Sequence, residues 1–322
     1  MANLFDWDKP LLRITKPVRL IECFSGIGAQ AKAFERLGVP FEHWRSYDFD
    51  KYAVRSYNAI HGTAFEPADI REVHGADLGI TDTDKFEYVL TYSFPCQDLS
   101  CAGKMRGMKR GEGTRSGLLW EIERILNECQ ELPQILLMEN VPMVVADANI
   151  KDFAEWVAYL ERKGYTNSWQ ILNAKDYGVP QNRERCFMVS FLGEFRYEFP
   201  CPIPLPYYLG ALLDETVDDK YYIKGEAADK LCSQIVQVER ERELAGRYGW
   251  AVEHHLTAGT HVTLSTWSAT KKRITKPIKV AYTILARDYK GWQPNRENTA
   301  VVRFPAYTRK HHRTFKEEDC NH

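Results

Sequence analysis

One cysteine of the chain lies where a reactive thiol would be useful. The apolar run 86–92 predicts a buried strand, and Pro95-Cys96-Gln97 follows it closely. Ligands and catalytic groups gather at the carboxyl ends of parallel strands, and an ionised thiol is a strong nucleophile. Cys96 is therefore a candidate nucleophile. A buried structural cysteine is the more common role for this residue type, so the position of Cys96 alone leaves both roles open.

Acidic and basic side chains flank two further predicted strands. Glu139-Asn140 ends the strand predicted at 134–138, at the same sheet edge as Cys96. A carboxyl group close to a thiol suits acid or hydrogen-bond chemistry on a heterocycle. Gln181-x-Arg183-x-Arg185 precedes the apolar strand predicted at 186–192 and places two guanidinium groups on one face of an extended segment. Ordinary surface charge is the alternative for these two arginines.

A glycine-containing loop joins the strand predicted at 18–23 to a helix that should end near Leu37. Its sequence, Phe24-Ser25-Gly26-Ile27-Gly28, would let a ligand approach the backbone beside the free N–H groups of a helix N-terminus. A plain tight turn is an equally good interpretation of the same residues.

Two short acidic segments follow the glycine loop along the chain. Asp48 and Asp50 flank Phe49 after the strand predicted at 43–47. A carboxylate there can accept hydrogen bonds from ribose hydroxyls, or it can cap a helix. Asp69-Ile70 offers a similar choice between the amino group of an adenine and the capping of a turn. These residue types suit a nucleotide-like cofactor without requiring one.

Taken together, the motifs resemble those of the cytosine-C5 DNA methyltransferases in order and spacing. The resemblance covers roughly residues 18–195, and it is carried by Phe24-x-Gly26-x-Gly28, Pro95-Cys96-Gln97, Glu139-Asn140-Val141 and Gln181-x-Arg183-x-Arg185. Supporting stretches are Gly103-Lys104, Arg115-Ser116-Gly117-Leu118 and Leu172-Asn173-Ala174-x-Asp176-Tyr177-Gly178-Val179-Pro180. The resemblance implies a Rossmann-like, S-adenosylmethionine-dependent methyltransferase sheet.

The resemblance also implies a role for each residue at the reacting base. Cys96 would add to C6 of a cytosine flipped out of duplex DNA, which makes C5 nucleophilic toward a methyl group. Glu139 would bond N3 and N4 of the base, Arg185 would hold O2, and Arg183 would support the loop or a phosphate. The other expected contacts to the base and the DNA are the Phe94 carbonyl, Gln97, Ser100, Lys104 and Asn140.

The cofactor that the resemblance implies is S-adenosylmethionine, and no metal is expected in the site. The glycine loop would line the methionine part, Asp48 would bond the ribose, and Phe49 and Asp69 would contact the adenine. The expected cofactor residues are Phe24, Gly26, Gly28, Asp48, Phe49, Asp69, Ile70, Pro95 and Leu118.

The elements that must position these residues alternate between strand and helix. Between and after the strands, the sequence predicts helices ending near Leu37 and covering 50–60, 117–130 and about 151–163, with a strand at about 167–173. This alternation predicts an α/β fold, with βαβ units around a largely parallel sheet and helices on both faces.

A proline-rich joint, Cys201-Pro-Ile-Pro-Leu-Pro206, predicts a domain boundary. We expect a catalytic, cofactor-binding domain over 1–200 and a smaller, partial target-recognition region over 201–322. Residues 257–313 carry twelve Lys and Arg against two acids, a net charge of +10, whereas the whole chain has −1. This basic block suits double-stranded DNA as the partner, with a solvated basic surface as the alternative.

The composition of the 322 residues excludes several classes of protein. Hydrophobic residues make up 44% and charged residues 27%, which excludes low-complexity disorder and collagen. No window approaches 18 uncharged apolar residues, no secretory signal is found, and the eight cysteines lack zinc-finger spacing. These absences predict no membrane partner, and the resemblance implies a cytoplasmic enzyme of bacterial or phage origin, of the restriction–modification kind.

Two C-terminal motifs that are usual in the family, an Arg- and Leu-rich helix and a Gly-Asn-containing segment, are not found here. Residues 281–291 resemble target-recognition segments instead. We expect either a second subunit that supplies the two motifs or a truncated enzyme that binds its cofactor weakly. An RNA cytosine-C5 methyltransferase and a DNA-binding relative without catalysis are the alternatives. The motifs do not predict the DNA target sequence.

Overall fold

The computed structural model describes residues 9–99, 107–111, 114–212, 214 and 218, and the backbone of the strands within 255–304. The chain divides into two compact units. The first unit comprises Met1–Leu172 and Glu184–Cys201, and the second comprises Asn173–Arg183 and Pro202–His322. The division falls beside the proline-rich joint, and it groups Asn173–Arg183 with the second unit, although the sequence analysis assigned that segment to the first domain.

The first unit is built on a six-stranded sheet with the strand order β2-β1-β3-β4-β7-β5. The strands β2, β1, β3 and β4 are parallel, and β7 runs antiparallel to β4. The predicted α/β fold is confirmed, although the sheet is mixed. The strand bounds are β1 Val18–Cys23, β2 Phe41–Tyr47, β3 Glu87–Tyr92, β4 Ile135–Asn140, β5 Tyr165–Asn173 and β7 Glu184–Leu192.

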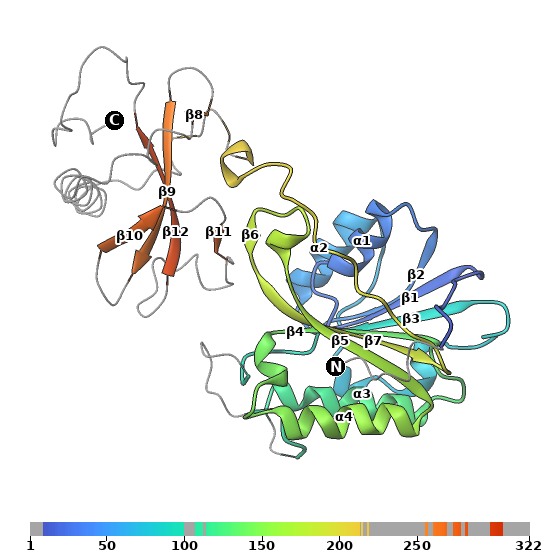
Figure 1. Ribbon diagram of the computed structural model, residues 1–322. Helices are drawn as coiled ribbons and strands as arrows, with labels where there is room; N and C mark the ends of the chain where they lie inside the picture. Colours follow the sequence, from blue (N-terminus) through green and yellow to red (C-terminus); the bar gives the residue numbers. More distant parts are fainter. Residues whose placement is uncertain are drawn as a thin grey trace, which may run out of the picture. The chain divides into compact units, whose positions relative to one another are not determined.

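Helices cover both faces of this sheet. Figure 1 shows α1 (Ala29–Arg36) and α2 (Lys51–His61) on one face, and α3 (Leu119–Glu128) and α4 (Ile150–Arg162) on the other. All six residues of β3 are buried, as expected for a central strand covered on both faces. Short 3-10 helices connect the elements: η2 Ile70–Glu72, η3 Gly75–Leu78, η4 Ser116–Leu118, η5 Pro142–Val145, η6 Ala174–Asp176 and η7 Leu209–Leu212.

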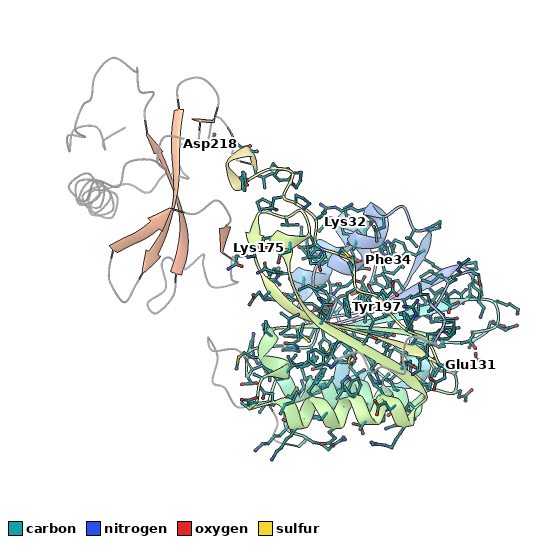
Figure 2. All side chains as sticks on the ribbon, viewed as in Figure 1. Lys32, Phe34, Glu131, Lys175, Tyr197 and Asp218 are labelled. Carbon is teal, nitrogen blue, oxygen red and sulfur yellow. The ribbon has the colours of Figure 1, made fainter. Side chains whose placement is uncertain are left out.

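The two faces of the sheet have cores of different size. The larger apolar cluster joins the sheet to α3 and α4 and includes Tyr92, Trp120 and Trp156. The smaller cluster lies on the α1 face and contains Leu20, Ala31 and a few other side chains. Side chains fill the space between the sheet and its helices on both faces (Figure 2).

The second unit contains a separate antiparallel sheet, with the order β10-β9-β12 and β8 paired to β9. The strands β11 and β6 pair in parallel and form a separate two-stranded sheet. The bounds are β6 Gln181–Asn182, β8 His255–Leu256, β9 Thr260–Ser268, β10 Arg273–Pro277, β11 Ala281–Tyr282 and β12 Glu297–Phe304. Residues 226–246, whose charged sequence predicts a helix, lie outside the described residues. In the described part of the chain, no helix has the length and apolar character needed to cross a membrane.

Candidate active site

Cys96 lies in a tightly held turn just after β3. Its thiol is free and its residue is half-buried, while Phe94 beside it is fully buried. The Pro95 carbonyl accepts a hydrogen bond from Ser116 Oγ at 2.7 Å, and the Cys96 carbonyl accepts one from Leu99 N at 3.0 Å. Two backbone carbonyls are therefore fixed on either side of the thiol, which limits the positions that Sγ can occupy.

Asp98 closes the segment that follows the cysteine. Its buried carboxylate accepts from Arg115 N at 2.7 Å, its carbonyl accepts from Gly107 N at 3.1 Å, and its own N–H donates to Ser116 Oγ at 3.3 Å. These bonds tie both ends of the intervening loop to one residue. Sequence analysis missed Asp98, whose only sequence signal is an acid two positions after the cysteine.

The predicted DNA-contacting residues of this loop have different outcomes. Gln97 is exposed, and its Oε1 accepts a hydrogen bond from the Arg115 guanidinium. Ser100 and Lys104 lie outside the described residues, so their predicted contacts stay predictions.

Two hydrogen bonds join the ends of three elements around Cys96. Asn140 Nδ2, at the end of β4, donates to the Phe94 carbonyl at 3.0 Å, and Asn140 Oδ1 accepts from Val141 N at 2.8 Å. Gln30 Nε2, in the first turn of α1, donates to Ser93 Oγ at 2.9 Å. The cysteine turn is thus held beside both the end of β4 and the start of α1. Asn140 is 2% exposed, and these two bonds make it a positioning residue.

Glu139 and Arg185 form an ion pair at the same sheet edge. Arg185 Nε lies 2.9 Å from Glu139 Oε1, and the two side chains are only 16% and 21% exposed. The antiparallel register of β4 and β7 sets Asn140 opposite Cys186, which brings the ends of the two strands together. The pair orients both charged groups toward one another. Sequence analysis had predicted separate contacts with the base for each of them.

Arg183 belongs to the second unit. Its backbone N–H donates to Asn173 Oδ1 at 3.1 Å, and its carbonyl accepts from Ala174 N at 3.0 Å. The loop that carries Arg183 is therefore closed on itself by Asn173.

Three further cysteines among the described residues, Cys23, Cys129 and Cys186, pack in the larger apolar cluster. Burial raises the pKa of Cys186 to about 12 and that of Cys129 to about 11, and it also raises the pKa of Cys23. A thiol with a raised pKa is rarely ionised near neutral pH and is a poor nucleophile. These three cysteines are structural.

The glycine loop is held from below by Asp48. Gly26 N donates to Asp48 Oδ2 at 2.9 Å, and Asp50 N donates to Asp48 Oδ1 at the same distance. Phe24 takes a positive φ of 58°, which is uncommon for a bulky residue and marks the sharp turn out of β1. These hydrogen bonds and this backbone conformation define the shape of the loop.

Gly28 is required by both backbone conformation and space. Its φ is +80°, and a Cβ at this position would lie 2.3 Å from His61 Nε2 and 2.7 Å from Tyr57 Cε2. His61 Nε2 also lies 3.2 Å from the Ile27 carbonyl. The end of α2 therefore supports the glycine loop directly, and sequence analysis missed both His61 and Tyr57 in this role.

The acidic residues near the glycine loop make different contacts: Asp50 and Asp69 cap helices, and Asp48 bonds the loop. Asp50 caps α2 by accepting from Tyr52 N and Ala53 N. Asp69 caps η2 by accepting from Arg71 N, and the Arg71 side chain that bonds it lowers the pKa of Asp69. Asp48 caps no helix and holds the glycine loop instead.

Among the apolar side chains expected or found near the loop, two are exposed and two are packed in the protein. Phe49 is 71% exposed and Ile27 is 56% exposed. Ile70 is buried, and Leu118 packs against the larger apolar cluster. An exposed aromatic ring beside an open glycine loop is the arrangement that a stacked adenine would cover.

Comparison with known proteins decides the family. The sequence model of the C-5 cytosine-specific DNA methylases matches residues 18–320, almost the entire chain. The chain belongs to this family. It is a DNA (cytosine-5-)-methyltransferase by membership, and its class of reaction is methyl transfer to C5 of cytosine in DNA. The family description names DNA, so an RNA substrate is not favoured.

Curated relatives agree with this assignment. The chain is 32% identical over 257 residues to the Type II methyltransferase M2.ScrFI of Lactococcus lactis subsp. cremoris, covering 65% of this chain and 71% of that protein. It is 34% identical to the Type II methyltransferase M.NlaX of Neisseria lactamica, with 76% and 74% covered. It is 43% identical to the orphan methyltransferase M.SssI of Spiroplasma monobiae over 185 residues, which cover 55% of this chain but 45% of that protein.

Solved structures show the same fold at lower sequence identity. The Entamoeba histolytica methyltransferase EhMeth aligns with a TM-score of 0.55 and 21% identity, covering 69% of this chain and 67% of that one. The S. pombe Dnmt2 methyltransferase aligns with a TM-score of 0.53 and 22% identity, covering 68% and 67%. The methyltransferase fold of the chain is therefore confirmed.

Proposed function

We propose that this family member transfers a methyl group from S-adenosylmethionine to C5 of a cytosine flipped out of duplex DNA, through a transient bond between Cys96 Sγ and C6. The observation that carries the proposal is the pair of hydrogen bonds from Asn140 and Gln30 to the cysteine turn. Asn140 follows Glu139 on β4, and Gln30 lies just after the glycine loop. The candidate nucleophile, its acidic partner and the cofactor loop are thus held at one sheet edge.

The residues around the glycine loop fit the proposed cofactor. Asp48 uses one lone pair on each oxygen for Gly26 N and Asp50 N, so its carboxylate keeps acceptor sites for ribose hydroxyls. Gly26 has no atom within 4 Å of a hypothetical Cβ, which leaves the loop backbone open to a ligand. Phe49 offers an exposed ring for the adenine. When bound, the sulfonium would supply an electrophilic methyl group.

Cys96 supplies the electrons that make the cytosine reactive. C5 of cytosine is a poor nucleophile, because its electrons belong to the aromatic ring. Addition of the Cys96 thiolate to C6 breaks that aromaticity and gives C5 the character of an enamine carbon. After C5 has taken the methyl group, loss of the C5 proton and expulsion of the thiolate restore the ring.

Glu139 and Arg185 stabilise the charge that this addition creates. Glu139 would hydrogen-bond N3 and N4 of the base, and Arg185 would hold O2. Their ion pair fixes the Glu139 carboxylate before the base arrives, which lowers the reorganisation needed in the reaction. The Phe94 carbonyl already accepts from Asn140 and keeps a second lone pair for N4 of the base. Arg183 would support the adjoining loop or a phosphate.

The test of this assignment is to trap the covalent bond. Duplex DNA carrying 5-fluorocytosine in its target site should form a stable adduct with the full chain and cofactor, because fluorine cannot leave C5 as a proton does. Mass spectrometry should place the adduct on Cys96.

Cys96→Ser should abolish both adduct and methyl transfer while it keeps cofactor binding, because an alcohol is far less ionised than a thiol with a pKa of about 8.5. Cys201→Ser, at an exposed and free thiol, is the matched control. Methyl transfer at the wild-type rate by Cys96→Ser would refute the assignment.

The second unit is proposed to recognise the DNA. Residues 257–313 carry the basic block, with Gln97, Ser100 and Lys104 as further contacts from the first unit. If six basic side chains meet phosphates, the logarithm of the binding constant should fall with the logarithm of salt concentration at a slope of roughly −5. Full-length protein with Lys271, Lys272, Arg273, Lys276 and Lys279 changed to Gln should show a flatter slope. An unchanged slope would place the DNA contacts elsewhere.

The second subunit and the cytoplasmic location stay predictions from the sequence. Calorimetry of the chain alone tests the first of them. Micromolar affinity for S-adenosylmethionine together with full, sequence-specific turnover would show that no partner is needed. Weak binding that a second polypeptide restores would support the split enzyme.

A further inference from the structure

A cluster of three potential metal ligands lies behind the glycine loop, apart from the proposed active site. It consists of Glu35 on α1, His43 on β2 and His61 at the end of α2. One nitrogen of each imidazole and one carboxylate oxygen all lie within 4.8 Å of one another. Two imidazoles and one carboxylate form a donor set that zinc commonly uses.

The imidazole of His43 is oriented by a partner on its Nδ1. This nitrogen lies 3.0 Å from the Tyr57 hydroxyl. The Tyr57 hydroxyl donates its own hydrogen to Glu22 Oε2 at 2.6 Å, so its oxygen must accept from His43 Nδ1–H. His43 is then the Nδ1–H tautomer, and its Nε2 has a lone pair to offer.

The imidazole of His61 is oriented in the same manner on its Nε2. That nitrogen lies 3.2 Å from the Ile27 carbonyl, which can only accept a hydrogen bond. The other ring nitrogen, Nδ1, lies 2.8 Å from Glu35 Oε1, and the His61 side chain is fully buried. Each imidazole thus has an outer partner on one nitrogen and turns the other toward the cluster. Histidines that bind metals typically show this arrangement.

Glu35 supplies the accessible side of the cluster. Its side chain is 31% exposed, and its Oε2 bonds Lys32 Nζ, which leaves Oε1 facing His61. Lys32 is labelled on α1 in Figure 2. This partly exposed carboxylate is the side of the cluster that faces solvent.

We propose that Glu35 Oε1, His43 Nε2 and His61 Nδ1 bind one Zn²⁺ ion, with water as the fourth ligand, and that the ion braces the glycine loop. Ligand atoms of a tetrahedral zinc site stand ~3.3 Å apart. Glu35 Oε1 and His61 Nδ1, now 2.8 Å apart, would separate slightly, and the other ligand atoms, which lie within 4.8 Å of one another, would adjust to that spacing. The ion replaces the proton on His61 Nδ1 and leaves Nε2–H bonded to the Ile27 carbonyl. It would thereby join α1, β2 and α2 directly behind the loop.

Cobalt(II) binding to the full chain tests the site independently of methyl transfer. Tetrahedral nitrogen and oxygen coordination gives strong visible bands without the near-ultraviolet charge-transfer bands of thiolate ligands. This distinction matters because the chain has eight cysteines. We expect one equivalent of Co²⁺ to bind with the nitrogen and oxygen spectrum and to be displaced by Zn²⁺. We also expect a saturating excess of Zn²⁺ to raise Tm by about 5 °C.

Substitutions of the ligands should weaken metal binding selectively. His43→Gln keeps a donor for Tyr57 but removes the ligand nitrogen, and it should weaken Co²⁺ binding by about 100-fold or more and abolish the Zn²⁺-dependent shift in Tm. Glu35→Gln, at an exposed position, should weaken binding without endangering the fold. His74→Gln is the matched control, since His74 Nδ1 also pairs with a glutamate, Glu128, at 3.1 Å. Thiolate bands, wild-type binding by His43→Gln and Glu35→Gln, or no binding at micromolar metal would each overturn the proposal.

Discussion

The two faces of the six-stranded sheet are packed with different chemistry. The α3 and α4 face is filled by aromatic and aliphatic side chains, with Trp156 stacked on Tyr159 and its Nε1 donating to the Tyr92 hydroxyl. The α1 and α2 face has a small apolar cluster and a chain of hydrogen-bonded polar groups that runs from the buried Glu22 and Tyr57 to the half-buried His43. On this second face, His61 Nε2 lies 3.2 Å from the Ile27 carbonyl of the glycine loop.

The difference separates stability from orientation. Buried apolar area contributes about 25 cal/mol per Å² wherever it lies, and it is insensitive to the direction of each contact. A buried hydrogen bond contributes only about 1 kcal/mol net to stability, but while it is intact it fixes the geometry of both partners. When it is broken, it leaves an unsatisfied polar group. The large apolar face therefore holds the unit together, whereas the polar face fixes the loop that would hold the cofactor.

Trp156→Ala should have the largest effect on stability. The side chain is fully buried in the larger cluster, and its loss should lower the free energy of unfolding by about 3–5 kcal/mol, as measured by urea titration. Trp169→Ala is the control, because Trp169 is 39% exposed and should cost less. Equal losses at both positions would mean that the α4 face does not dominate stability.

Gly28→Ala should damage the glycine loop more than a simple backbone effect predicts. The left-handed φ costs about 1–2 kcal/mol for an alanine, and the clash with His61 and Tyr57 adds an overpacking cost of about 1–3 kcal/mol. Gly38→Ala is the control, since Gly38 has a φ of +66° and no atom within 4 Å of a Cβ. We expect calorimetry to show lost cofactor binding only for Gly28→Ala. Equal effects of the two variants would show that contact with His61 does not determine the shape of the loop.

Tyr57→Phe should have an intermediate effect. It leaves one oxygen of the buried Glu22 carboxyl without its hydroxyl donor and frees His43 Nδ1, which should cost about 1–3 kcal/mol in urea unfolding. Tyr52→Phe on the same helix, where Tyr52 is 68% exposed, should change stability little. A neutral Tyr57→Phe would show that the polar network contributes nothing to this face.

Glu22→Gln should have the smallest effect, visible as a change in pH dependence. Burial raises the pKa of Glu22 above its ordinary value of 4.5, against the opposing effects of the Tyr57 hydroxyl, Ala31 N–H and His61. The folded state then holds the proton more tightly than the unfolded state. The contribution of Glu22 is therefore complete below pH 4.5 and is lost as the pH rises through the raised pKa.

Glutamine does not titrate, so Glu22→Gln should flatten this decline when the free energy of unfolding is measured between pH 4.5 and 8. Glu66→Gln, at an exposed position, is the control and should keep the wild-type profile. A decline of wild-type slope in Glu22→Gln would assign the pH dependence to another group.

Much of the fold could be predicted because its signals are local. The run 86–92 is mostly apolar, and its residues Glu87–Tyr92 form a strand that is buried along its whole length. Helix limits were also close, since Asp50 and Gly62 cap α2 through their own backbone conformations and side chains. The reversal of β7 could not be predicted, because an apolar run has no direction until it pairs with β4.

By itself, the sequence determined the family, the order of strands and helices along the chain, and the residue types at the strand ends. These follow from hydrophobic periodicity and short motifs, which act within a few residues. Only the tertiary structure decided that Asn140 bonds Phe94, that Asp98 closes the cysteine loop and that Glu139 pairs with Arg185. It also brought Glu35, His43 and His61 together. Such contacts join residues far apart in the chain, and their geometry exists only once the sheet has fixed which strand ends are neighbours.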